Sequence, residues 1–194
     1  MSSRSRRTRE RILKEAHTLL AEHGYHGVGL EEVARAAGVS RQAVYLHFAS
    51  KSDLLVAVAQ YLDASVGIPE IVRLIGEARN AVEALDRAVE VYAAIEPKIY
   101  DVASAIYAAR RSDEAAEAAW QDRMAYRRQS AMRLAEALAA EGALADGWTV
   151  EEAADFMWAL LSVHTYEYLV VERGWPMDRF ISYLQAVLRS ALVN

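Results

Sequence analysis

Residues 30–55 of this 194-residue chain read LEEVARAAGVSRQAVYLHFASKSDLL, and they decide the fold of its N-terminal part. Apolar residues recur with helical spacing on both sides of Gly38, a residue that accepts the positive φ of a sharp turn. Ser40 is a good N-cap for the second helix, expected over residues 41–48. Two short helices joined by a tight turn are typical of a helix-turn-helix, whose second helix lies in the major groove of DNA. The stretch therefore predicts binding to double-stranded DNA.

Polar residues at the start of the second helix are candidates for reading bases, because packing does not need their faces. Arginine can bind guanine through two hydrogen bonds and glutamine can bind adenine in the same way, each worth about 1–3 kcal/mol of discrimination. Arg41 and Gln42 are the expected base readers, and Ser40 with the helix N-terminus offers donors to a phosphate. The alternative is an ordinary solvated helix face, which explains one such residue more easily than the whole set.

The charge of the chain is unevenly distributed. Residues 1–52 carry nine Lys and Arg against five acids, whereas the remaining 142 residues carry 13 against 22. A basic N-terminal part on an acidic body fits a small nucleic-acid-binding module joined to a second domain. Arg4, Arg6, Arg7 and Arg9 either form an arm that reaches DNA or belong to a flexible solubilising tail. The expected domains are residues 1–52 and 53–194.

The whole chain reads as all-α. It has 54% apolar and 25% charged residues, only nine Gly and three Pro, and no pattern of alternating strands. The absence of Cys excludes disulfides and thiolate metal sites, and the absence of a long apolar run or signal peptide predicts a cytoplasmic protein. Pro97 is expected to begin a new helix and Gly174 to end one. About nine helices are expected, over residues 8–23, 30–37, 41–48, 52–65, 71–95, 97–109, 112–141, 149–173 and 176–192.

With these elements in place, the chain resembles the TetR family of transcriptional repressors, most strongly over residues 9–55. Gly29 departs from the family, which usually has Thr or Ser there to cap the helix expected over residues 30–37 and contact a phosphate. A glycine can still cap the helix, but any phosphate contact must then come from the backbone. The resemblance rests on the Gly24-Tyr25 helix end, the VARAAGVS turn, the Tyr45-x-His47-Phe48 segment, and Lys51 with Leu54-Leu55.

The resemblance also implies roles for individual residues of the DNA-binding part. It makes Tyr45 and Lys51 phosphate contacts and lets His47 contact the backbone or a base edge. The predicted DNA-binding residues are Ser40, Arg41, Gln42, Ala43, Tyr45, Leu46, His47 and Lys51.

The family architecture predicts an N-terminal three-helix DNA-binding head followed by a larger helical bundle for ligand binding and dimerisation. By resemblance, the last two helices pair with their copies to form a two-fold homodimer, which would bind a palindromic operator. The alternative for their apolar stripes is the core of a single chain, and each helix can serve both purposes on different faces. The predicted interface residues are Phe180, Tyr183, Leu184, Val187 and Leu188.

The body contains more aromatic residues than a minimal core needs, which suits a pocket for a small-molecule effector. Taken singly, each of these residues fits the core or the surface better than a ligand contact. Arg123 and Arg127 either bind an acidic effector or, more simply, form salt bridges. The predicted ligand-binding residues are Tyr92, Tyr107, Trp120, Met124, Trp158 and His164.

A helical enzyme and an interaction module without DNA binding are the competing functions. The sequence contains no Glu-x-x-His pair, nucleophile elbow, phosphate loop or His-Glu-x-x-His motif. Neither alternative explains the basic N-terminal part, and no cofactor or metal is expected.

Overall fold

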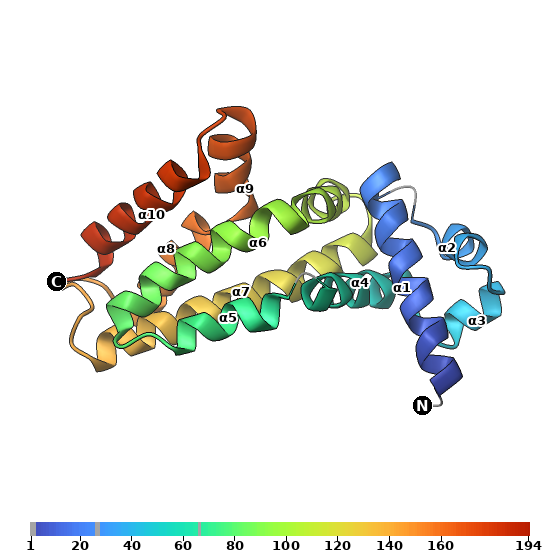
Figure 1. The fold of residues 1–194 in the computed structure, drawn as a ribbon, viewed down its shortest axis with the longest axis horizontal. Coiled ribbons are helices and arrows are strands. Elements are labelled where there is room, and N and C mark those ends of the chain that lie inside the picture. Colours follow the sequence, from blue (N-terminus) through green and yellow to red (C-terminus); the bar gives the residue numbers. More distant parts are fainter. Residues whose placement is uncertain (1–2, 26–27, 66) are drawn as a thin grey trace. The chain divides into compact units, whose positions relative to one another are not determined.

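The computed structural model describes residues 3–25, 28–65 and 67–194 of the chain. Within these ranges it contains ten α-helices, one π-helical segment and a single isolated bridge between Leu144 and Val193 in place of any sheet (Figure 1). The all-α fold class is therefore confirmed. None of the helices in the described ranges combines the length and hydropathy that a membrane-spanning segment requires.

The helices follow one another with short connections. Their bounds are α1 Ser3–His23, α2 Leu30–Ala36, α3 Arg41–Tyr45, α4 Lys51–Ser65, α5 Ile68–Gly76, α6 Ala81–Ala109, α7 Glu114–Ala140, α8 Val150–Leu160, α9 Val163–Tyr166, the π-helical segment η2 Glu167–Glu172, and α10 Met177–Leu192.

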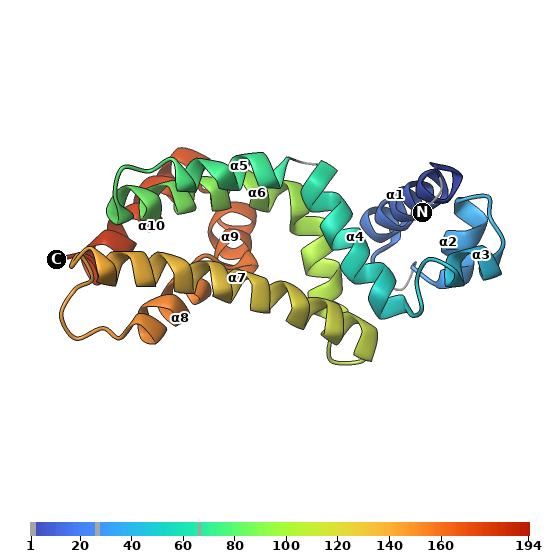
Figure 2. The same cartoon turned by 90° about the horizontal axis from the view of Figure 1, so that it is seen from below.

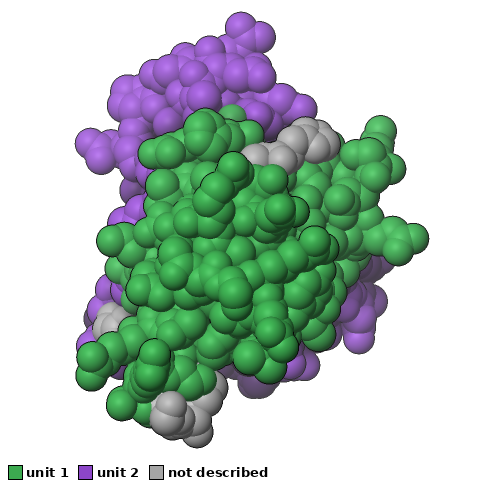
Figure 3. Space-filling model, turned by 90° about the vertical axis from the view of Figure 1, so that its right-hand side faces the viewer, with its two compact units in different colours: residues 1–66, 99–123 green, residues 67–98, 124–194 purple. Residues whose placement is uncertain are grey.

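Contacts divide the chain into two compact units, coloured separately in Figure 3. Unit 1 comprises Met1–Val66 and Ile99–Arg123, and unit 2 comprises Gly67–Lys98 and Met124–Asn194. Helix α4 and the chain around the α6–α7 connection thus belong with the N-terminal helices. The functional division after residue 52 stays a prediction.

In unit 1, α1 packs on α2 and α4, and α2 packs on α3. Ile12, Ala16 and Leu20 of α1 are spaced by four residues and are fully or almost fully buried. Helix α1 begins at Ser3, earlier than the predicted residue 8. Arginine favours helix, and neither Gly nor Pro interrupts this segment, so the arginine-rich start is helical and forms no extended arm.

The predicted helix break at Pro97 is wrong, because α6 continues through this residue. A proline inside a helix lacks one backbone N–H and costs about 3 kcal/mol. Burial of apolar side chains on both sides of Pro97, including Ile95 and Ile99, offsets this cost.

In unit 2, the single helix predicted over residues 149–173 is interrupted at Leu161, whose φ and ψ are −85° and 57°. The side chain of Ser162 caps α9, and the π-helical segment η2 follows directly. Two long side chains satisfy the carbonyl groups at the break: Arg127 donates to Leu161, and the Tyr92 hydroxyl donates to Ser162 at 2.7 Å. Helix α10 contacts both α8 and η2 (Figures 1 and 2).

Candidate nucleic-acid interface

The geometry of α2, the turn and α3 is set by local signals. Gly38 has a φ of +61°, the left-handed conformation that only glycine adopts cheaply. Ser40 follows with extended backbone, and its Oγ accepts a hydrogen bond from the N–H of Ala43 at 3.1 Å. Val44 and Phe48 are buried and hold α3 in place. This is the helix-turn-helix predicted from the sequence, although α3 ends at Tyr45 and residues 46–47 form a turn.

The predicted base readers lie on the surface of α3. Ser40, Arg41, Gln42 and Tyr45 are exposed, Leu46 is 80% exposed, and Ala43 and His47 are half-buried. Seven of the eight predicted DNA-binding residues are thus brought together on α3 and the turns at its ends, with side-chain atoms accessible to a ligand.

Arg41 is held by its own helix. Its Nη2 donates to the Tyr45 hydroxyl at 3.3 Å, its guanidinium lies 5.6 Å from the centre of the Tyr45 ring, and Glu31 of α2 is 3.9 Å away. The hydrogen bond to Tyr45 raises the pKa of Arg41 above its ordinary value. Because these contacts are exposed, DNA can replace them at low cost.

Lys51, the eighth predicted residue, makes different contacts. Its Nζ lies 3.7 Å from Oδ2 of Asp113 and 3.7 Å from the centre of the Tyr25 ring. Asp113 also caps α7, because its Oδ1 accepts from the N–H of Ala115 at 2.8 Å. A hydrogen bond with Tyr25 lowers the pKa of Asp113, and burial raises the pKa of Tyr25. Lys51 therefore has an intramolecular anion, which no sequence pattern could reveal across 62 residues.

The described ranges offer no metal site: within them, no three His, Cys, Asp or Glu side chains are arranged to hold an ion.

Comparison with known proteins identifies the family. A model described as bacterial regulatory proteins of the tetR family matches residues 12–58, which span α1 to the first half of α4. The regulator AcrR of Shigella flexneri is 39% identical over 64 residues, or 33% of this chain and 30% of AcrR. The activator FasR of Mycolicibacterium smegmatis is 42% identical over 52 residues, or 27% of this chain and 24% of FasR. Over residues 12–58, the chain belongs to the TetR family.

The fold likeness extends over nearly the whole chain. A crystal structure described as a TetR-family transcriptional regulator from a Rhodococcus species has a TM-score of 0.76 and 22% identity, covering 95% of this chain and 98% of that one. The chain aligns with less than a third of the length of AcrR or FasR. The sequence likeness to these two proteins thus covers a third of this chain or less.

The difference from the TetR family at Gly29 has a structural counterpart. Gly29 is the N-cap of α2, with φ of −92° and ψ of 152° and no side-chain cap. A Cβ added at Gly29 would collide with the carboxylate of Glu32. The Glu32 carboxylate thus occupies the space that a side chain at residue 29 would need.

The predicted effector-binding residues are divided between the two units, with Tyr107 and Trp120 in unit 1. Of the predicted ligand residues, Trp120 lines an apolar cavity of about 40 Å³ in unit 1, between α4, α6 and α7. Tyr107 stacks on Trp120 with ring centres 4.9 Å apart. This volume is far below the roughly 300 Å³ at which ligand pockets begin.

The other four predicted ligand residues belong to unit 2. Tyr92 is buried and bonded to the backbone at the α8–α9 break, and burial raises its pKa. Met124 is half-buried, and Trp158 is 37% exposed. His164 is partly exposed and lies 3.7 Å from a carboxylate oxygen of Glu167.

Two body arginines that are candidates for binding an acidic effector both pair with acids of the same chain. Arg123 pairs with Asp63, and Arg127 pairs with the buried Glu96 at 2.9 Å. The salt-bridge interpretation of both residues therefore describes the structure.

The five predicted interface residues of α10 differ in their exposure within one chain. Phe180, Leu184 and Leu188 of α10 are completely buried within one chain, so they form its core. Tyr183 is 50% exposed and Val187 is half-buried, which leaves these two for an interface. The five predicted residues lie on two neighbouring faces of α10. In the sequence these faces cannot be told apart, because apolar residues spaced by three and by four both fit one side of a helix.

Proposed function

We propose that the chain is a transcriptional repressor that binds a palindromic operator as a homodimer and dissociates when a small-molecule effector binds. The proposal rests above all on one observation: Arg41, Gln42 and Tyr45 are exposed together on α3, the second helix of a TetR-family helix-turn-helix. A protein that covers an operator blocks RNA polymerase without further machinery. Such a regulator would act in the bacterial cytoplasm.

Base reading would come from the first turn of α3. In the major groove, Arg41 can donate two hydrogen bonds to guanine, and Gln42 can pair with adenine. The phenol of Tyr45 can then contact a phosphate while keeping the Arg41 side chain extended. Buried Val44 and Phe48 anchor α3 and so fix the positions of these side chains.

Dimerisation would use the exposed aromatic side chains of unit 2. Trp158 of α8, Tyr168 of η2 and Tyr183 of α10 are 37%, 56% and 50% exposed. Large apolar side chains exposed on adjoining elements often mark an interface, and α10 contacts both α8 and η2. A two-fold dimer would hold its two α3 helices about one DNA turn, or 34–36 Å, apart.

Effector control would act through α4, which begins at Lys51 directly after the helix-turn-helix. Ala59, Leu62 and Asp63 of α4 line the small cavity beside Trp120. A ligand that enters must widen this cavity and displace α4. It weakens DNA binding only if it prefers the widened arrangement.

Binding to DNA tests the function. In a gel-shift series with an operator selected from random DNA, Arg41→Ala should weaken operator binding and relax the preference at one base pair. Lys51→Ala should weaken binding to all sequences alike. Arg41→Ala with unchanged sequence preference would refute the role of Arg41, and failure of the wild type to bind any DNA would refute the function.

A further inference from the structure

We propose that the N-terminal half of α1 and the α2–α3 turn form a groove for the sugar–phosphate backbone of DNA, with Arg4 and Arg11 as its phosphate ligands. The inference rests on the proposed DNA binding and deepens it by adding a second contact surface. The α1 groove is an open groove of about 740 Å³ lined by Ser3, Arg4, Arg7, Thr8, Arg11, Gly38, Val39, Ser40 and Ala43.

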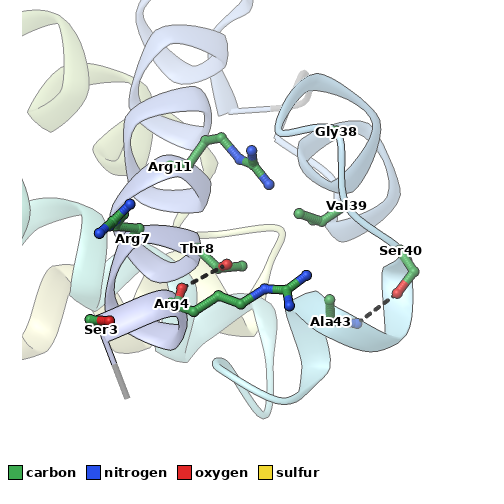
Figure 4. A pocket seen from close by; sticks show the side chains of 9 residues that line it. All are labelled: Ser3, Arg4, Arg7, Thr8, Arg11, Gly38, Val39, Ser40 and Ala43. Carbon is green, nitrogen blue, oxygen red and sulfur yellow. Dashed lines mark hydrogen bonds between the residues drawn. The ribbon is translucent and has the colours of Figure 1, made fainter. Parts of the chain in front are cut away.

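The two walls of the α1 groove differ in chemistry. Arg4 and Arg11 extend from α1 toward the turn, while Arg7 extends along the other side of the helix (Figure 4). The opposite wall is backbone and small side chains, ending at Ser40 and Ala43 of the α3 start. One wall therefore supplies positive charge and the other allows close approach.

The arginines of the α1 groove carry uncompensated charge. Among the residues that the structure describes, no acid forms an ion pair with Arg4, Arg7 or Arg11. Most body arginines are neutralised by acids of the chain, namely Arg73, Arg79, Arg87, Arg123, Arg127, Arg128 and Arg189. Guanidinium groups gathered along one groove without acids favour an anionic occupant.

The spacing of the arginines fits a polymer better than a small anion. Arg4 and Arg11 are seven residues apart, so their Cα atoms lie about 10.5 Å apart along the helix axis. One DNA strand carries a phosphate about every 3.4 Å of duplex axis, so this span covers several successive phosphates. Because Ser40 and Ala43 border the same groove, the bound strand would flank the bases that α3 reads.

The helical form of this segment argues against insertion into the minor groove. An α-helix with side chains is about 10–12 Å wide, whereas the minor groove of B-DNA is about 6 Å wide. Contacts from α1 would therefore fall on phosphates, which position the protein and carry no base sequence.

The matched experiment compares Arg4→Ala/Arg11→Ala with Arg6→Ala. Arg6 is exposed on the same helix but does not line the α1 groove. Operator affinity is measured by fluorescence anisotropy at several salt concentrations, with thermal unfolding as a check that each variant is folded. The slope of log K against log salt should fall by about 0.9 for each phosphate that is no longer neutralised, hence by about 3.6 for the double variant on both heads of a dimer. Arg6→Ala should keep the wild-type slope, and sequence preference should not change.

A second measurement locates the contact. Operators that carry one neutral methylphosphonate at successive positions should weaken wild-type binding at the phosphates flanking the α3 contact, and should weaken the double variant much less. Inorganic phosphate at constant ionic strength should leave the melting temperature of the wild type unchanged.

The outcomes separate the two levels of the proposal. Failure of the wild type to bind DNA overturns the proposed function itself. If the wild type binds DNA normally but the double variant keeps the wild-type salt slope and the wild-type response to methylphosphonates, only the α1 groove is overturned. A loss of A·T preference in the double variant would assign these arginines to the minor groove, and a phosphate-induced rise in melting temperature confined to the wild type would assign them to a small anion. Both results contradict the inference.

Discussion

Replacing Arg127 by Met should cause a large loss of stability. Arg127 donates to Oε1 of Glu96 at 2.9 Å and to the carbonyl of Leu161, and its guanidinium lies 5.7 Å from the centre of the Tyr92 ring. The side chain of Glu96 is only 2% exposed, while that of Arg127 is 18% exposed. The variant therefore leaves a carboxylate buried without its cation.

The expected loss in the free energy of unfolding follows from the burial of Glu96. Removing one partner of a buried ion pair costs about 3–5 kcal/mol, and removing the donor to Leu161 adds about 1 kcal/mol. We expect a total near 4 kcal/mol, since the methionine retains part of the apolar packing. In a domain of this size, the melting temperature should fall by about 8–16 °C.

The assay is urea unfolding at one fixed protein concentration, because the proposed dimerisation would make stability depend on concentration. The neighbouring Arg128→Met is the matched control, since Arg128 pairs with Asp155 at 2.8 Å on the surface and should lose less than about 1 kcal/mol. Combining Arg127→Met with Glu96→Gln should recover part of the loss. Equal losses for Arg127→Met and Arg128→Met would refute the reasoning.

Three further changes have defined outcomes. Asp113→Asn keeps the cap of α7 but frees Lys51, so filter binding should show a rise of up to about fivefold in affinity for all DNA sequences, and weaker binding would contradict the proposed competition. Thr149→Ala removes the capping box of α8 and should cost about 1 kcal/mol in urea unfolding, whereas Thr149→Ser should cost less than half of that. The hydrogen bond from Arg79 lowers the pKa of Glu83 to about 2 from 4.5, so its contribution to stability is complete above pH 4.5 and is lost as the pH falls toward 2. Glu83→Gln should flatten the pH dependence of the free energy of unfolding in that window. An unchanged pH dependence would count against a stabilising pair of Arg79 and Glu83.

The helix-turn-helix could be predicted because its signals are local. A glycine at the turn, a serine cap and the spacing of Val44 and Phe48 each act within a few residues, and all agree. The prediction at Pro97 fails for the opposite reason: the local preference of proline to begin a helix is outweighed by apolar burial along the whole of α6.

Hydrogen bonds and ion pairs between residues far apart in the sequence explain the remaining differences between the predicted and the observed structure. The break at Leu161 depends on donors from Arg127 and Tyr92, which are 34 and 70 residues from their partners. The ion pair of Lys51 with Asp113 likewise joins residues that no periodicity connects. These contacts decide which predicted site residues are available to ligands, so only the structure could assign them.

Selection of bound fragments from random DNA by the purified wild-type protein is the decisive test of operator recognition. We predict a palindrome whose half-sites are centred about 10–10.5 base pairs apart or slightly more, with a guanine contact that disappears in the parallel selection with Arg41→Ala. Absence of enrichment, or a motif that is unchanged in the Arg41→Ala selection, would contradict recognition through α3.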